Sequence, residues 1–194
     1  VVLRYSKRGM NILKKYLKDG YCRTAAEKLL HAERGTVLLT TGFYVAGYAE
    51  TDGPLGTVAV AEALNQLGFH SVVVTDKYCK GFFELKQLDV EYVDIAADEQ
   101  VYEDILDKYN PVYMISIERC GENAEHEYAN MRGVSITSET AAIDHLFELA
   151  PEKHIPTIGV GDGGNEIGMG NVKDIISEKL ELNPCVVPVD DLII

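Results

Sequence analysis

The sequence predicts an α/β fold in which a mostly parallel sheet is covered by helices on both faces. Short runs of β-branched and other apolar residues recur along the chain, as in strands that are buried on both sides. Segments with the apolar spacing of amphipathic helices separate these runs. Helices and strands alternate without a long linker, which favours one parallel sheet over two domains.

Residues 1–35 are expected to form a helical extension, packed on a single α/β domain within residues 1–194. Its helices are predicted at 6–17 and 24–32, and the basic stretch 4–18 is interpreted as a solvated helix face. The strands that follow are predicted at 36–41, 71–75, 91–95, 112–117, 155–160 and 185–189. The helices between them are predicted at 54–67, 79–88, 99–109, 139–149 and 171–180. With right-handed crossovers, this order gives a Rossmann-like, doubly wound sheet.

Single residues support several of these boundaries. Asp52 is a suitable N-cap for the helix at 54–67, and Pro54 fits its first turn. Gly68 can end that helix in a left-handed conformation. Asn110-Pro111 should stop the helix at 99–109, because a helix rarely continues through the residue before proline.

Composition excludes several classes of function. The formal net charge of −13 repels phosphate backbones, so nucleic-acid binding is not expected. No apolar run approaches the roughly 20 residues that span a bilayer, so no membrane association is expected. The four cysteines form no CxxC pair, so neither a zinc site nor a disulfide framework is indicated. We expect a cytoplasmic protein that is compatible with homo-oligomerisation.

Four carboxylates are predicted at one edge of the sheet, where ligands bind in open α/β folds. They are Asp52, Asp76, Glu118 and Asp162, each at or beyond the carboxyl end of a predicted strand. Singly, each is best explained as a helix cap or a solvated loop acid. Together they repel one another unless a metal, a basic side chain or a cationic substrate offsets their charge, which indicates a site.

The glycine-rich segment 159–164 matches the pattern G-x-G-x-x-G, so a nucleotide-binding enzyme is one interpretation. Asp162 counts against it, because a negative charge inside the turn opposes a pyrophosphate. A second interpretation is a sharp turn around a small ligand, with Asp162, Asn165 and Glu166 as oxygen ligands or acid/base groups. Asp162 and Glu166 would then suit Mg²⁺ or Mn²⁺. A purely structural glycine turn is the third.

The substrate is expected to be a small acidic molecule. Arg119 and Arg132 flank the loop 118–133, and an arginine can bind a carboxylate through two hydrogen bonds. The full set of expected substrate-binding residues is Thr41, Gly42, Glu50, Thr51, Arg119, Arg132, Gly161, Gly163, Gly164 and Asn165.

Five segments together resemble the D-glutamate cyclase C-terminal domain family. They are TTGFYVAGYAETDGPLGTVAVAEAL at 40–64, VVVTDKY at 72–78, ISIERCGEN at 115–123, YANMRGVSIT at 128–137 and IGVGDGGNEIGMGNV at 158–172. The resemblance covers nearly the whole chain and is that of a stand-alone, prokaryotic-type member. Members of the family continue beyond the position of Ile194, so further residues can contribute to the site.

The resemblance implies a carbon–oxygen lyase that converts D-glutamate into 5-oxo-D-proline and water. Asp162 or Glu166 would be the general base, and Glu118 or Asp76 the acid that protonates the departing oxygen. Arg119 or a divalent cation would stabilise the oxyanion, with Asp52 as a further catalytic carboxylate. A non-catalytic sensor of an acidic metabolite remains an alternative.

Overall fold

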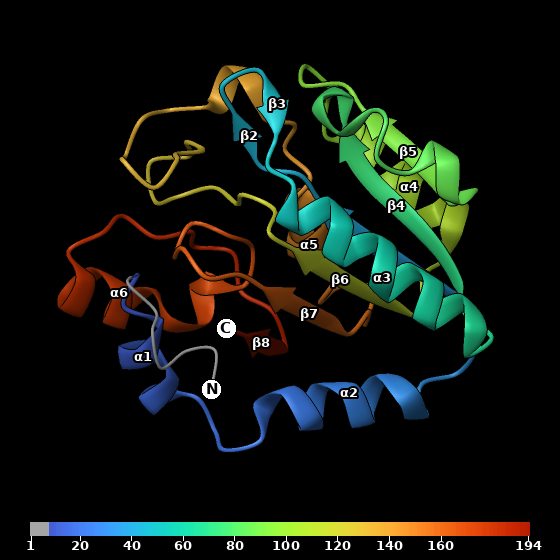
Figure 1. Cartoon of the computed structure of the whole chain (residues 1–194), viewed down its shortest axis with the longest axis horizontal. Helices are drawn as coiled ribbons and strands as arrows, with labels where there is room; N and C mark the ends of the chain where they lie inside the picture. The colour runs from blue at the N-terminus through green and yellow to red at the C-terminus, as the bar shows by residue number, and fades with distance from the viewer. Residues whose placement is uncertain (1–7) are drawn as a thin grey trace.

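The computed structural model describes residues 8–194, with a six-stranded sheet at the centre. Its strands are β1 Thr36–Thr41, β4 His70–Asp76, β5 Asp89–Val93, β6 Tyr113–Ile117, β7 Thr157–Val160 and β8 Asp191–Ile193. Neighbouring strands are parallel throughout, in the order β5–β4–β1–β6–β7–β8. The chain winds outward from β1 to β5, returns to β6 and winds outward again to β8 (Figure 1). This strand order confirms the predicted Rossmann-like fold class.

Helices cover both faces of the sheet. They are α1 Met10–Leu13, α2 Tyr21–His31, α3 Asp52–Gln66, α4 Gln100–Tyr109, α5 His145–Leu149 and α6 Lys173–Leu180. Figure 1 shows α3 in front of the sheet and α4 and α5 behind it. Val37 and Leu39 of β1 join one hydrophobic cluster with α3, and Leu38 joins the other with α4 and α5. The strands are apolar throughout because both faces are buried.

The N-terminal helices contact the domain at two places. Met10 and Leu13 of α1 are buried in the cluster behind the sheet. α2 lies along the edge strand β8, where Lys28 Nζ is 2.7 Å from Asp191 Oδ1. The predicted helix at 6–17 is shorter than expected, because Lys14–Tyr16 forms a 3₁₀ turn. Residues 6 and 7 lie outside the described residues.

The predicted helix at 79–88 is wrong. Two 3₁₀ turns, Lys77–Cys79 and Glu84–Lys86, take its place. Gly81 between them has φ +101°, which no α-helix allows. The Glu84 carboxylate accepts the N–H groups of Gly81 and Phe83, so the backbone donors are satisfied locally instead of by a helix.

The predicted strand at 185–189 is also wrong. Its backbone pairs with two loops, since Cys185 N donates to Gly164 O and Val186 N donates to Glu122 O. Pro188 has no N–H to offer a sheet, and the sixth strand begins only at Asp191. The predicted helix at 139–149 is formed only by α5: Thr137–Glu139 is a 3₁₀ turn, and the carbonyl of Ala141 accepts the N–H of Ile143 and the Arg119 side chain.

One element was not expected from the sequence. β2 Tyr44–Val45 and β3 Tyr48–Ala49 form a short antiparallel hairpin after β1. Ala46 and Gly47 turn it with φ angles of 49° and 100°, the pair of positive values that a type I′ turn needs. The hairpin therefore places Glu50 and Asp52 at the carboxyl edge of the sheet.

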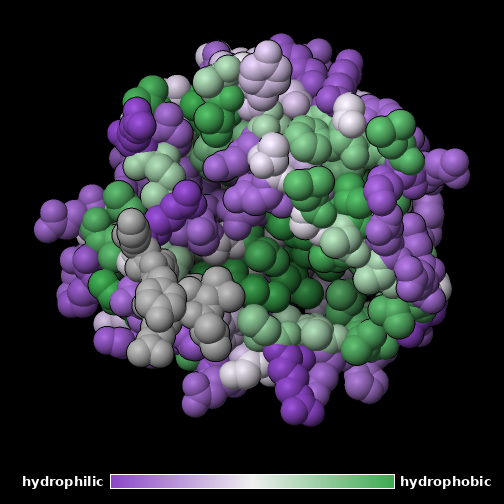
Figure 2. Space-filling view, in the orientation of Figure 1, coloured by the Kyte–Doolittle hydropathy of each residue, from purple (hydrophilic) through white to green (hydrophobic). Residues whose placement is uncertain are grey.

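The face in front of the sheet is hollowed near its centre. Figure 2 shows hydrophobic residues in this hollow and hydrophilic residues around much of the rim. Val160 and Ile193, which are partly buried, pack against the hydrophobic cluster on this side. Within residues 8–194, no helix combines the length and apolar character needed to cross a membrane.

Candidate functional site

Three carboxylates meet beyond the carboxyl ends of β6 and β7. Oxygen atoms of Glu118, Asp162 and Glu166 all lie within 4.8 Å of one another. Glu118 directly follows β6 and has a left-handed backbone, with φ 50°. Its N–H donates to the carbonyl of Val160 at 2.9 Å, which holds the ends of the two strands together. Parallel strands end at one edge, so these acids converge although they are distant in sequence.

The glycine-rich turn is built around the Glu166 carboxylate. Gly163 N donates to Glu166 Oε1 at 2.7 Å, and Gly164 N donates to Oε2 at 2.8 Å. A Cβ added at Gly161 would lie 2.7–2.9 Å from side-chain carbons of Glu166, and one at Gly163 would lie 2.6 Å from Oε1. Gly164 also has φ +96°, a conformation that favours glycine. The turn therefore needs its glycines to enclose a carboxylate.

The same geometry weighs against the nucleotide-binding interpretation. In a dinucleotide fold the fingerprint follows the first strand, and its backbone N–H groups face the pyrophosphate. Here the pattern follows β7, the fifth strand of the sheet, and two of its N–H groups bind Glu166. After β1 the chain instead carries Glu50 and Asp52, whose charge opposes a phosphate at the start of α3.

Burial and like charges raise the pKa values of Glu118, Glu166 and the neighbouring Glu50. Burial is the main cause that raises the pKa of Glu118 to about 9, and Glu166, Asp162 and Asp52 add to it. Burial also raises the pKa of Glu166, although the N–H groups of Gly163 and Gly164 oppose this. The pKa of Glu50 is raised by partial burial and then by Asp52. Glu118 therefore carries a proton at neutral pH.

Arg8 reaches this cluster from the N-terminal segment. Its guanidinium forms an ion pair with Asp162, with side-chain exposures of 44% and 52%. Glu50 and Glu166 are also near enough to act on the Arg8 charge. The basic stretch 4–18 is interpreted as a solvated helix face; Arg8 is indeed exposed, but it precedes α1 and pairs with Asp162. No local sequence signal identifies a partner 154 residues away.

Asp76 and Arg119 do not join the cluster. They form a buried ion pair, with Arg119 Nη1 2.6 Å from Asp76 Oδ2 and side chains 1% and 4% exposed. Arg119 also donates to the carbonyls of Gly42 at 3.0 Å and Ala141 at 2.6 Å. Its Nη1 and Nη2 atoms are thus occupied inside the protein. The geometry argues against the predicted roles of Arg119 as a substrate ligand and Asp76 as a catalytic acid.

The other expected residues around β1 differ in accessibility. Thr41 and Gly42 are buried, and the Gly42 carbonyl binds Arg119. Thr51 and Asp52 are exposed at the start of α3, near the cluster. Asp52 is the first residue of the helix rather than its N-cap, which is Thr51. The predicted N-cap is therefore one residue too late. The Asp52 Oδ1 atom still accepts a backbone N–H of the first turn, that of Gly53, at 2.8 Å.

A pocket of about 360 Å³ adjoins the glycine turn, and we call it the glycine-turn pocket. It brings together four of the expected substrate-binding residues, Arg132, Gly163, Gly164 and Asn165. A larger pocket of about 810 Å³ lies at the opposite edge of the sheet, beside the first residues of β6, β7 and β8. None of the expected site residues lines it.

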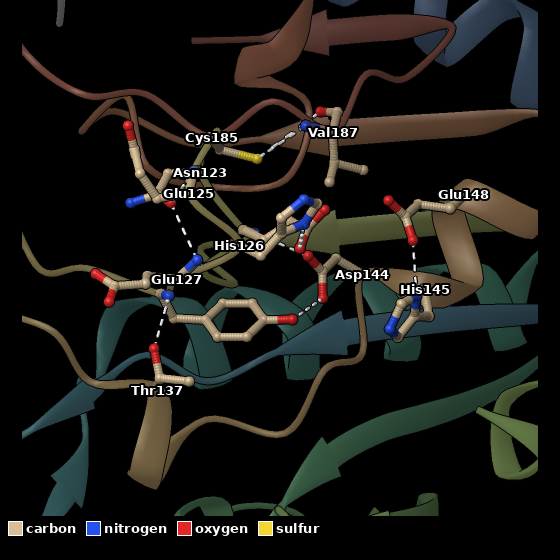
Figure 3. A network of polar contacts seen from close by, with 12 residues as sticks. Asn123, Glu125, His126, Glu127, Thr137, Asp144, His145, Glu148, Cys185 and Val187 are labelled. Carbon is tan, nitrogen blue, oxygen red and sulfur yellow. Dashed lines mark hydrogen bonds and ion pairs between the residues drawn. The ribbon is translucent and has the colours of Figure 1, made fainter. Parts of the chain in front are cut away.

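A buried polar network anchors one wall of the glycine-turn pocket. Tyr128 Oη donates to Asp144 Oδ1 at 2.6 Å, and Glu122 N donates to Oδ2 at 2.8 Å. Burial raises the pKa of Asp144, and burial followed by the Asp144 charge raises that of Tyr128. Figure 3 shows Asp144, at the start of α5, on the side of the loop that carries Asn123 and Glu127. The long loop after β6 is therefore tied to the body of the domain.

Comparison with known proteins identifies relatives. Residues 3–194 match the family described as D-glutamate cyclase-like, C-terminal. The chain is 34% identical over 176 residues to the mitochondrial D-glutamate cyclase of Homo sapiens, covering 78% of this chain and 28% of that protein. It thus spans little more than a quarter of the curated relative.

Solved structures show a weaker likeness. WbmG of Bordetella bronchiseptica, in complex with NAD, has a TM-score of 0.43 at 12% identity, over 67% of this chain and 38% of that one. UDP-glucose 4-epimerase of Thermotoga maritima, with UDP-glucose, has a TM-score of 0.43 at 19% identity, over 66% and 38%. By the family match and the identity to its human relative, the chain belongs to the D-glutamate cyclase-like C-terminal domain family.

Proposed function

We propose that this domain is a lyase that converts D-glutamate into 5-oxo-D-proline and water at the cluster of Glu118, Asp162 and Glu166. The observation that carries the proposal is the convergence of three carboxyl groups, one of which, the partly buried Glu118, has a pKa raised to about 9. Family membership and the name of the human relative support the choice of substrate.

The reaction needs two protons to move from nitrogen to oxygen. The substrate amine attacks the carbon of the γ-carboxyl group, a C–N bond forms, and one C–O bond breaks to release water. The ammonium loses two protons in total, and the departing oxygen gains two. No net proton is therefore taken up, and groups that pass protons over a short distance suffice.

The three carboxylates differ in ways that suit these transfers. Glu118 holds a proton at neutral pH and is the acid that protonates the departing oxygen. Asp162 is half exposed, so it can take a proton from the incoming ammonium. Glu166 is held by two backbone N–H groups and attracts the ammonium to the cluster. Holding the amine and the γ-carboxyl group together lowers the entropic part of the barrier.

The same residues fit a divalent cation. Carboxylate oxygens are the ligands that Mg²⁺ and Mn²⁺ prefer, and those of Asp162 and Glu166 converge closely enough to share one ion, with the Glu118 carboxyl group beside them. When bound, such an ion would polarise the γ-carboxylate and neutralise the charge that develops on its oxygen.

A direct assay tests the function. Purified protein is incubated with D-glutamate or L-glutamate, with Mn²⁺, with Mg²⁺ or with a chelator, and 5-oxoproline is followed by NMR or mass spectrometry. We expect 5-oxo-D-proline from D-glutamate, at least a hundred-fold less with Glu118→Gln, and normal turnover with the control Glu62→Gln on the exposed side of α3. Thermal stabilisation by D-glutamate without any product would instead indicate a sensor.

A further inference from the structure

We infer that the glycine-turn pocket binds the α-carboxylate of the substrate through Arg132, so that the enzyme selects amino acids with a free carboxylate beside the attacking amine. The inference rests on the proposed cyclisation and names the substrate class of that same site. Its basis is the position of the pocket, the unpaired guanidinium of Arg132 and the shape of a folded glutamate.

The pocket lies one residue away from the catalytic carboxylates. Gly163 separates the two, since its N–H binds Glu166 while the residue itself lines the pocket. A Cβ at Gly163 would lie 2.6 Å from Glu166 Oε1 and 2.7 Å from Met131 Sδ, a side chain of the pocket wall. Gly163 is therefore the point at which the enclosed Glu166 carboxylate and the pocket wall meet.

Arg132 is the one cationic side chain among the described residues that line the pocket, and Glu127 and Glu181 are its two acidic ones. Its guanidinium has no hydrogen-bond or ion-pair partner within residues 8–194, and the side chain is exposed to the pocket and solvent. A guanidinium in this state can bind a carboxylate through two parallel hydrogen bonds.

A tight turn holds Arg132 in place. Asn130 Oδ1 accepts the N–H groups of Arg132 at 2.9 Å and Val134 at 3.1 Å, and Gly133 N donates to the Asn130 carbonyl at 2.9 Å. Asn165 links this loop to the glycine-rich turn, because its Nδ2 donates to the carbonyl of Ala129 at 2.7 Å. The turn is thus ordered around its own hydrogen bonds and does not depend on the Arg132 guanidinium.

Asn165 adds an unpaired acceptor next to Gly163. Because its Nδ2 faces a carbonyl, the remaining atom is Oδ1, which is buried and has no hydrogen-bond partner among the described residues. The side of the pocket nearest Glu166 therefore favours a hydrogen-bond donor, such as the substrate ammonium, and Arg132 on the turn favours an anion.

The folded shape of glutamate during cyclisation indicates that its α-carboxylate is the group that binds Arg132. Cyclisation brings the amine and the γ-carboxyl group together at the acidic cluster, so the α-carboxylate is the one charged group that points away. The cluster repels it, and Arg119 is buried against Asp76. Arg8 already pairs with Asp162. Arg132 remains as its partner on the pocket side of Gly163.

A substrate lacking the α-carboxylate gives the decisive comparison. 4-Aminobutyrate keeps the amine and the carboxyl group that cyclise, but it has no α-carboxylate. We expect Arg132→Gln to lower kcat/KM for D-glutamate 10- to 100-fold and to change that for 4-aminobutyrate by less than twofold. Arg132→Lys should be intermediate, because it keeps the charge but loses the two-pronged geometry. The control Arg23→Gln removes an exposed arginine of α2 that pairs with Glu27.

Binding provides a measurement that does not depend on turnover. Calorimetry with D-glutamate and 5-oxo-D-proline on Glu118→Gln, with and without Arg132→Gln, should show at least tenfold weaker binding when Arg132 is absent. The inference would be overturned if Arg132→Gln lowered kcat/KM equally for D-glutamate and 4-aminobutyrate, or if it left the calorimetric affinity for D-glutamate unchanged. If wild-type protein forms no 5-oxoproline, the proposed function fails, while the calorimetric comparison still decides whether Arg132 binds the carboxylate.

Discussion

Gly163 donates its backbone N–H to the Glu166 carboxylate at 2.7 Å, and this contact explains why the turn after β7 is rich in glycine. The pattern that resembles a phosphate-binding fingerprint encloses a side chain of the protein itself. The turn holds a negative charge where the fingerprint would receive one from a ligand.

Gly163→Ala should disable the site, because the new Cβ would lie 2.6 Å from Glu166 Oε1 and displace that carboxylate. We expect at least tenfold slower 5-oxoproline formation and a lower Tm. The matched control is Gly56→Ala within α3, where the nearest atom, Ile117 Cγ2, is 3.6 Å from the new Cβ. Alanine there should be neutral or stabilising by up to about 1 kcal/mol. Equal effects of the two changes would contradict this account.

The stability of the protein should fall as the pH rises, in part through Glu118. Its folded-state pKa of about 9 lies above the ordinary value of 4.5, so its protonated form is favoured by folding. The stability that it contributes is complete below about pH 4.5 and is lost as the pH rises through about 9.

Urea unfolding at pH 5, 7 and 9 measures this dependence. Glu118→Gln should show a flatter decline of unfolding free energy than wild type across this range and be the more stable of the two at pH 9. Glu62→Gln on exposed α3 should keep the wild-type slope. Parallel slopes for Glu118→Gln and wild type would show that Glu118 does not titrate in this range.

Arg8→Gln should change ligand binding more than stability. The ion pair with Asp162 is exposed, so its loss should cost less than about 1 kcal/mol. The guanidinium and a divalent cation compete for the same Asp162 carboxylate, so the variant should bind Mn²⁺ several-fold more tightly by calorimetry. Arg23→Gln should leave Mn²⁺ affinity unchanged. Weaker Mn²⁺ binding by Arg8→Gln would mean that Arg8 supports the cation site.

Asp76→Asn should strongly destabilise the fold, because it leaves the Arg119 guanidinium buried without its counter-charge. Removing one partner of such a pair costs about 3–5 kcal/mol, which chemical denaturation detects readily. Glu91→Gln, which breaks the more exposed contact with Lys108, should change stability little by comparison. A small effect of Asp76→Asn would show that Arg119 finds another partner or reaches solvent.

The sequence by itself determined the fold class and the edge at which the acids gather. Buried strands such as 36–41 and 112–117 carry apolar residues on both faces, and a parallel sheet follows from that pattern. Parallel strands also end at one edge, which places Glu118 and Asp162 at the same side of the sheet, and the pairing of β6 with β7 brings them together. These features depend on local residue types, which a single sequence displays directly.

Only the tertiary structure decided which acids work together. Asp76 and Glu118 look alike in the sequence, yet one is neutralised by Arg119 and the other faces Asp162 and Glu166. The tertiary structure also determines the contact of Arg8 with Asp162 and the enclosure of Glu166 by the glycine-rich turn. Long side chains choose partners by their rotamers and by what the folded chain brings near, and neither is encoded in local spacing.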